Sequence, residues 1–151
     1  ARSERETGFR NAALTNFIKS FGQIDNDVED VLALYCRQCS IVANCVQLAR
    51  AFGFLANGGE QPGTGQRIVD AEQARRINAL MLTCGTYDAA GEFAFKVGVP
   101  CKSGVGGAIV AVIPDIMVLC AWSPGLDETG NSVVARRALE LFVTRTGLSV
   151  F

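Results

Sequence analysis

The chain has 151 residues, of which 49% are hydrophobic and 19% are charged. This composition is typical of a globular domain with an apolar core and excludes an intrinsically disordered chain. The net charge is -1, from 14 basic and 15 acidic residues, so nothing indicates a nucleic-acid partner or an anionic membrane surface. The absence of histidine excludes Ser-His-Asp and Cys-His catalysis, and H-E-x-x-H zinc sites, carried within these residues.

No membrane-spanning segment is expected. The longest apolar segment, residues 108–122, is interrupted by Pro114 and Asp115, whereas a span needs about 20 continuous apolar residues. The chain opens at Ala1 with polar residues rather than a signal peptide, which predicts a processed chain or a fragment.

The six cysteines are predicted to be reduced thiols that pack as small hydrophobic residues. Cys36 and Cys39 also have the C-x-x-C spacing of a redox or zinc pair, with Cys45 nearby. This second interpretation is the weaker one, because no further C-x-x-C pair and no histidine completes a zinc-binding set.

Two helices are predicted at the start of the chain. Ser3 begins a capping box of the S-x-x-E type, and an apolar stripe follows that ends near Gly22. Asp25 or Asp27 is expected to cap the second helix, which continues over residues 28–39.

Three more helices are predicted before the pattern changes. Ser40 is expected to cap a helix that runs over residues 41–56 and stops at a Gly-Gly pair. Asp70 opens a capping box for a helix that ends at Gly85. Residues 88–98 favour a short helix, because their alanines and a phenylalanine share one face.

The last third of the chain predicts a hairpin and a closing helix. Residues 102–107 are glycine-rich, and residues 108–113 and 116–122 are apolar runs separated by a Pro-Asp turn. Both strands are expected to be buried on both faces. A two-stranded hairpin of this kind cannot stand alone, so it needs helices over both faces and further strands from elsewhere. Asn131 or Ser132 is expected to cap the final helix.

These elements define an α/β (α+β) fold, with helices and part of an antiparallel sheet. We predict one domain part over residues 1–151, divided into a mainly helical region (1–85) and a region with the hairpin and closing helix (86–151).

Lys102, Ser103 and Gly104 stand directly before the first apolar strand. A Lys-[Ser/Thr]-Gly motif at a sheet edge is one of the signatures of penicillin-binding proteins and serine β-lactamases. Main-chain N–H groups beyond such a motif can stabilise an oxyanion, by about 3–4 kcal/mol per donor. A glycine-rich turn that enters a strand explains the same three residues without catalysis.

Four more side chains are candidates for chemistry. In a site without histidine, Tyr87 can relay protons between a serine and a leaving amine. For Tyr87 and Tyr35, packing with a satisfied hydroxyl is the alternative. Glu4 and Asn11 are seven residues apart, which places them on one helical face. Their carboxylate and amide could hold an ammonium and a carboxylate, or they are a solvated cap and a surface amide.

Eight segments spread over nearly the whole chain form a recognisable series. They are SERETGFRN (3–11), YCRQCSI (35–41), LANGG (55–59), CGTYD (84–88), GEFAF (91–95), KSGVGG (102–107), WSP (122–124) and GNS (130–132). In this order they resemble the C-terminal part of the serine-dependent glutaminases, which have the β-lactamase-like fold. The resemblance implies hydrolysis of L-glutamine to L-glutamate and ammonia, no cofactor or metal, a cytoplasmic location and a homo-oligomer (dimer or tetramer).

The resemblance also implies a set of site residues. Glu4 and Asn11 would bind the α-amino and α-carboxylate groups of glutamine, and Tyr35 would line the same pocket. Tyr87 would be the proton-transfer partner of the nucleophilic serine, and the backbone N–H of Val105 would be an oxyanion donor. Lys102 would shape the charge near the site, and Ser103 is a further possible site residue.

The chain departs from the family pattern at one point. The nucleophile of the family is the serine of a Ser-x-x-Lys motif, and none of the serines in this chain has a lysine three residues later. We therefore expect the nucleophile in an N-terminal half of the same protein, and we expect this chain alone to be inactive. A non-catalytic fragment and another β-lactamase-like serine acyl-transfer enzyme are the alternatives.

Overall fold

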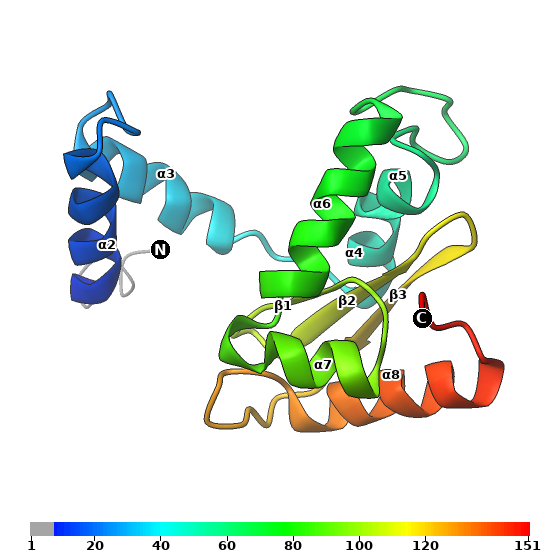
Figure 1. The fold of residues 1–151 in the computed structure, drawn as a ribbon. Helices are drawn as coiled ribbons and strands as arrows, with labels where there is room; N and C mark the ends of the chain where they lie inside the picture. Colours follow the sequence, from blue (N-terminus) through cyan, green and yellow to red (C-terminus); the bar gives the residue numbers. More distant parts are fainter. Residues whose placement is uncertain (1–7) are drawn as a thin grey trace. The chain divides into compact units, whose positions relative to one another are not determined.

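The computed structural model describes residues 8–151, and the chain forms two compact units, Ala1–Ala43 and Asn44–Phe151 (Figure 1). We call them unit 1 and unit 2. The expected capping box at Ser3 lies outside the described residues. The division of the chain into regions 1–85 and 86–151 remains a prediction.

Unit 1 contains two helices that pack against each other, α2 (Phe9–Ser20) and α3 (Val28–Cys39). Gly22 has a φ of 70°, and it follows α2 where the sequence predicts the helix to end. The Asp27 side chain caps α3 by accepting a hydrogen bond from the Glu29 N–H at 2.8 Å. The predicted end of the first helix near Gly22 is therefore confirmed, and Asp27, rather than Asp25, caps the second helix.

The next helix begins later than predicted. Ser40 does not start a helix, because its hydroxyl donates to a carbonyl one turn back and its N–H closes the end of α3. Asn44 is the N-cap instead, in a reciprocal capping box with Gln47. Two short helices follow, α4 (Cys45–Ala51) and α5 (Gly53–Ala56).

The helix predicted at Asp70 is confirmed. Asp70 and Gln73 form a capping box at the start of α6 (Ala71–Cys84), with bonds of 2.7 and 3.0 Å. A 3-10 turn (Tyr87–Ala89) then leads directly into α7 (Ala90–Lys96). These two elements correspond to the short helix that the sequence predicts within residues 88–98.

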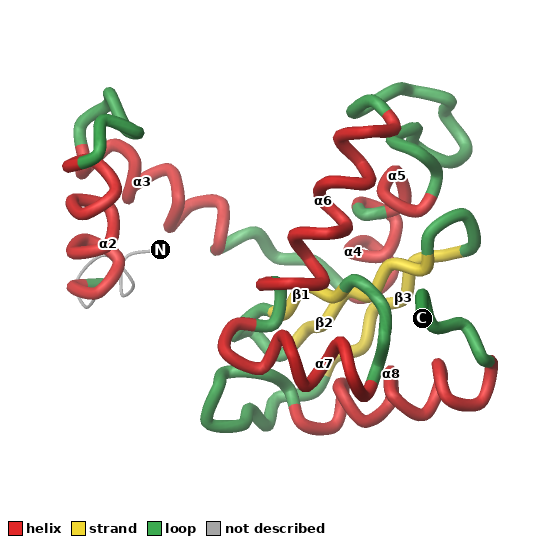
Figure 2. Tube along the Cα trace, in the orientation of Figure 1, coloured by secondary structure: helices red, strands yellow, loops and turns green. Residues whose placement is uncertain are grey.

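The sheet has three antiparallel strands in the order β1-β2-β3, as Figure 2 shows. The predicted hairpin consists of β2 (Ala108–Ile113) and β3 (Met117–Trp122). The third strand, β1 (Cys101–Ser103), is absent from the prediction, which begins a loop at Lys102. These three residues form a strand because they pair with β2. As expected for a strand, burial alternates along them, with the outer two residues buried and Lys102 exposed.

Helices cover both faces of the sheet in unit 2 (Figure 1). Ile109, Ala111 and Ile113 of β2 pack with α7 and with α8 (Val133–Thr146), and Val112 packs with α5 and α6 on the other face. The alternation follows from the two-residue period of a strand. The prediction of burial on both faces is correct for β2, whereas β3 is only partly buried within the described residues.

The final helix has the predicted limits, since Ser132 is its N-cap and Gly147, with a φ of 70°, follows its last residue. None of the helices within residues 8–151 is long and apolar enough to cross a membrane.

Candidate active site

Tyr87 lies where the chain turns from α6 toward α7, next to β1. Gly85 permits this approach, because a Cβ atom there would overlap the Cys101 carbonyl oxygen. The Ser103 N–H then donates to the Gly85 carbonyl at 2.9 Å. The Tyr87 hydroxyl donates to the Ser103 carbonyl at 3.2 Å, and the side chain is 40% exposed. The phenol is thus anchored to β1 while one side stays accessible.

Lys102 contacts the same two groups. Its ammonium lies 4.8 Å from the centroid of the Tyr87 ring, and it donates a hydrogen bond to the Ser103 carbonyl. A cation over an aromatic face contributes about 0.5–1 kcal/mol at an exposed site. A phenol and an ammonium therefore converge on one carbonyl oxygen at the end of β1.

Val105 belongs to the tight loop between β1 and β2. The Gly107 N–H donates to the Gly104 carbonyl at 2.9 Å, and the Trp122 indole donates to the Gly106 carbonyl at 2.8 Å. The Val105 N–H makes no hydrogen bond within residues 8–151, and its side chain is 66% exposed.

The side chains of Tyr87 and Val105 both lie next to Gly130. A Cβ atom on Gly130 would be 3.7 Å from Val105 Cγ1 and 3.8 Å from Tyr87 Cε2. The side chains of the two residues that the resemblance assigns to proton transfer and to the oxyanion thus both lie beside Gly130.

A loop before α8 supports this site, and the prediction from sequence assigned it no role beyond a helix cap. Asn131 is fully buried, and its Nδ2 donates to the Thr86 carbonyl at 3.0 Å and to Thr129 Oγ1 at 2.8 Å. Asp127 Oδ1 accepts from the N–H groups of Thr129 and Asn131, each at 3.0 Å. The Gly-Asn-Ser segment of the family pattern was the only signal for this arrangement.

The pKa of Asp127 reflects these contacts. Burial acts to raise the pKa of this carboxyl, but the hydrogen bonds from Thr129 and Asn131, together with the charge of Arg136, outweigh it and lower the pKa below its ordinary value. Asp127 is therefore ionised when it holds the loop near neutral pH.

Three side chains around Tyr87 carry buried polar atoms. Thr86, Ser103 and Asn131 are each at most 2% exposed, and Thr86 Oγ1, Ser103 Oγ and Asn131 Oδ1 have no hydrogen-bond partner within the described residues. Ser103 therefore meets Tyr87 through its carbonyl group rather than its hydroxyl.

Two of the three candidate substrate-binding residues of unit 1 line one hollow. Asn11 and Tyr35 face a space of about 250 Å³ between α2 and α3, which is otherwise mainly apolar. Tyr35 is 45% exposed, so it is not a core residue within unit 1.

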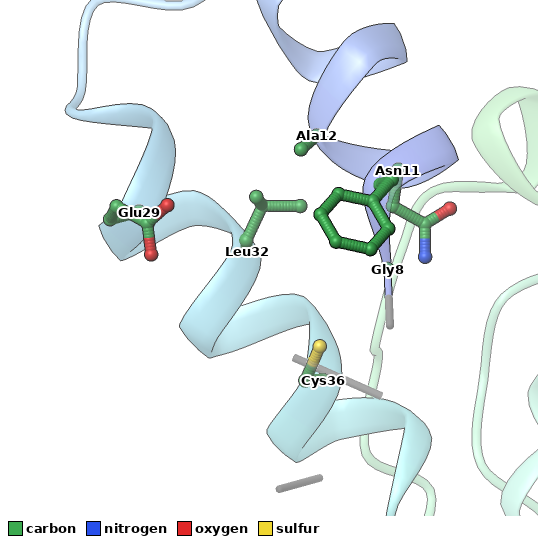
Figure 3. A pocket seen from close by; sticks show the side chains of 7 residues that line it. Gly8, Asn11, Ala12, Glu29, Leu32 and Cys36 are labelled. Atoms are coloured by element: carbon green, nitrogen blue, oxygen red, sulfur yellow. The ribbon is translucent and has the colours of Figure 1, made fainter. Parts of the chain in front are cut away.

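A second hollow of about 230 Å³ lies on the same helix pair (Figure 3). Asn11 lines it from α2, while Glu29, Leu32 and Cys36 line it from α3, with the Glu29 carboxylate at one end. Glu29 was not among the predicted site residues.

Glu4 lies outside the described residues. A single pocket that contains Glu4, Asn11 and Tyr35 together with Tyr87 and Val105 remains a prediction. Residues 8–151 include no group of three or more cysteine, aspartate or glutamate side chains that could hold a metal ion.

Comparison with solved structures identifies the fold class. A structure described as a probable glutaminase is 39% identical, with a TM-score of 0.93, over 99% of this chain and 48% of its own. The Bacillus subtilis glutaminase, solved as a covalent complex with 5-oxo-L-norleucine, is 35% identical, with a TM-score of 0.93, over 99% of this chain and 54% of its own. The fold is therefore that of the β-lactamase-like glutaminases.

The sequence model of the family described as Glutaminase matches residues 1–151, and the chain belongs to this family. The glutaminase of Methylobacterium radiotolerans is 58% identical over 151 residues, which are all of this chain and 49% of the relative. That of Aliarcobacter butzleri is 56% identical over 149 residues, 99% of this chain and 49% of the relative. The chain thus spans about half the length of the curated relatives it matches.

Proposed function

We propose that the full-length protein to which this chain belongs is a glutaminase that hydrolyses L-glutamine to L-glutamate and ammonia. The observation that carries this proposal is the match to the family over all 151 residues. The meeting of Tyr87 and Val105 beside Gly130 agrees with the roles that the family resemblance gives them.

The first step is an acyl transfer to a serine. The serine oxygen attacks the side-chain amide carbon of glutamine, and the negative charge on the amide oxygen is stabilised by the Val105 N–H. The Tyr87 hydroxyl relays protons: its oxygen accepts the serine proton while its own proton moves to the amide nitrogen. The carbon–nitrogen bond then breaks, and ammonia leaves a γ-glutamyl ester.

The second step is hydrolysis of this ester. Water attacks the ester carbon, the Tyr87 oxygen accepts a proton from this water, and the original hydroxyl proton of Tyr87 moves to the serine oxygen as the carbon–oxygen bond breaks. The products are glutamate and the free enzyme, so the cycle needs no cofactor.

The amino-acid end of the substrate is bound by residues of unit 1. Glu4 pairs with the α-ammonium group, Asn11 donates to the α-carboxylate, and Tyr35 adds a hydrogen bond from its hydroxyl. Charged groups bound in this way favour the free amino acid over a glutamine inside a peptide.

The serine nucleophile lies N-terminal to this chain, in the other half of the protein. In support, none of the serines here has a lysine three residues later, and the relatives are about twice as long. The reaction of the Bacillus subtilis relative with 6-diazo-5-oxo-L-norleucine, which forms a covalent complex, supports a covalent intermediate. We also propose a cytoplasmic location and a homo-oligomer, on the family resemblance alone.

Ammonia release from L-glutamine tests the proposal, with the full-length protein and the 151-residue chain assayed side by side. We expect the full-length protein to release ammonia and the 151-residue chain to release none. Ammonia release by the 151-residue chain would contradict the proposal that the nucleophile lies outside it. A full-length protein that is acylated by a labelled β-lactam but does not release ammonia would belong to another class of β-lactamase-like enzyme.

A further inference from the structure

Tyr87 has an unfavourable backbone conformation. Its φ is 57°, in the left-handed region, and of the described residues other than glycine only Tyr87 and Asp115 have a positive φ. This conformation is unfavourable for a residue with a Cβ atom, because the Cβ atom comes too close to the following carbonyl oxygen. A residue keeps it only where the surrounding contacts impose it, which is common at functional sites.

The contact that best explains this conformation comes from Asn131. The Thr86 carbonyl accepts a hydrogen bond from Asn131 Nδ2 at 3.0 Å and another from the Ala89 N–H at 3.2 Å. This carbonyl lies in the peptide plane that precedes Tyr87, and the orientation of that plane sets the φ of Tyr87. A donor that fixes the Thr86 carbonyl therefore fixes the direction in which the phenol leaves the main chain.

Asn131 is itself held on several sides. Its N–H donates to Asp127 Oδ1 at 3.0 Å, its carbonyl accepts from the Asp127 N–H at 2.8 Å, and its Nδ2 also donates to Thr129 Oγ1. A bridge between Leu126 and Ser132 closes the loop at its base. The side chain is fully buried, so its amide cannot turn toward water.

We infer that Asn131 is a positioning residue for catalysis, which holds the Thr86–Tyr87 peptide so that the Tyr87 hydroxyl stays aimed at the reacting groups. This inference rests on the proposed glutaminase function, in which Tyr87 transfers the proton. Gly130, the neighbour of Asn131, lies against the edge of the Tyr87 ring, so one loop contacts both the Thr86 carbonyl and the ring of Tyr87.

A double-mutant cycle in the full-length protein tests this role. Asn131→Ala is expected to lower kcat roughly tenfold to a hundredfold, because a misplaced catalytic group is this costly, while KM changes less than about twofold. In a Tyr87→Phe background, the same substitution is expected to lower kcat by less than about threefold. Effects that multiply in the double mutant would indicate a general structural role and overturn the inference.

Ser132→Ala is the matched control. Ser132 is also fully buried in this loop, and its hydroxyl donates to the Ser123 carbonyl at 2.9 Å, away from Thr86. We expect kcat to stay within about twofold of wild type. A decrease equal to that of Asn131→Ala would mean that any lost bond in the loop has this effect, which would overturn the inference.

Thr129→Ala keeps the test open if Asn131→Ala does not fold. Thr129 is exposed, and its hydroxyl accepts the second Asn131 amide proton. We expect kcat to fall about threefold to fivefold, and this decrease to disappear in the Tyr87→Phe background. A decrease that persists in that background would count against the inference.

The outcomes separate this inference from the proposed function. A wild-type full-length protein that releases no ammonia contradicts the proposed function. The positioning role is then tested by crystal structures of wild type and Asn131→Ala: a Tyr87 φ that moves out of the left-handed region supports it, and an unchanged φ overturns it.

Discussion

The two units differ in how completely they bury their apolar residues. Unit 2 has a sheet with apolar clusters on both faces. In the described part of unit 1 only Thr15 and Cys36 are buried, and six large apolar side chains are more than 60% exposed. These are Phe9, Phe17, Phe21, Leu34, Ile41 and Val42.

This difference separates the two kinds of candidate site residue. Tyr87 and Val105, which we assign to chemistry, belong to the unit with a core of its own. Asn11 and Tyr35, which we assign to substrate binding, belong to a helix pair whose apolar surface stays exposed. We therefore expect substitutions in unit 2 to change kcat and stability, and substitutions in unit 1 to change mainly KM.

The largest effect is expected for Tyr87→Phe in the full-length protein. Loss of the proton-transfer hydroxyl should lower kcat about 10²- to 10⁴-fold, while KM for glutamine stays nearly constant. Steady-state kinetics of ammonia release measure both parameters. An unchanged kcat would rule out the proton-transfer role.

The next largest effect is expected on stability, where one substitution in each unit compares how well the two units are packed. Leu139 of α8 is 3% exposed, so Leu139→Ala should lower the free energy of unfolding by about 2–5 kcal/mol. Phe17 is 62% exposed and makes an edge contact with Phe21, so Phe17→Ala should cost about 1 kcal/mol. Urea unfolding of the full-length protein and its two variants gives both values. Equal losses would show that unit 1 is as well packed as unit 2.

Glu4→Gln tests the binding role of unit 1. Loss of the charge that pairs with the substrate ammonium should raise KM about tenfold to a hundredfold, with a smaller change in kcat. Glu6→Gln, which makes the same change two residues away, should leave KM unaltered. Identical kinetics for Glu4→Gln and wild type would remove Glu4 from the site.

The smallest effect concerns the pH dependence of unit 2. Because the folded-state pKa of Asp127 is lowered, its ionised form stabilises the fold above the ordinary value of 3.8, and this stability is lost as the pH falls through the folded-state pKa. In Asp127→Asn the decrease in Tm between pH 7 and pH 3 should therefore be smaller than in wild type. The exposed neighbour Glu128 provides the control, Glu128→Gln. Identical pH profiles for wild type and Asp127→Asn would contradict the stabilising role.

Local signals predicted most of the fold correctly. The Asp70 capping box, the hairpin and the end of the last helix at Gly147 each depend on a few neighbouring residues. The start of α4 was missed because the apolar pattern over residues 41–56 continues without a break, although the Ser40 hydroxyl bonds back into α3. Hydrogen bonds of this kind compete with a new helix and leave no trace in the pattern.

The sequence patterns did not predict contacts between residues that are far apart in the sequence. β1 has only three residues, and only its pairing with β2 makes it a strand. The family resemblance, rather than the residue type, suggested a role for Tyr87. Its anchor on the Ser103 carbonyl, 16 residues away, and the bond from Asn131 to Thr86, 45 residues away, depend on the folded chain. The sequence therefore indicates a candidate residue more readily than the contacts that hold it.

The edge of β3 has a consequence for handling this chain. Within the described residues β3 is the last strand on one side of the sheet, and Met117–Trp122 contains no charge and no proline. An uncharged edge of this kind offers a row of free backbone groups to any other strand, which is the geometry of edge-to-edge aggregation. Chains produced without the rest of the protein should therefore self-associate as their concentration rises, and a lysine introduced into this edge should keep them dispersed.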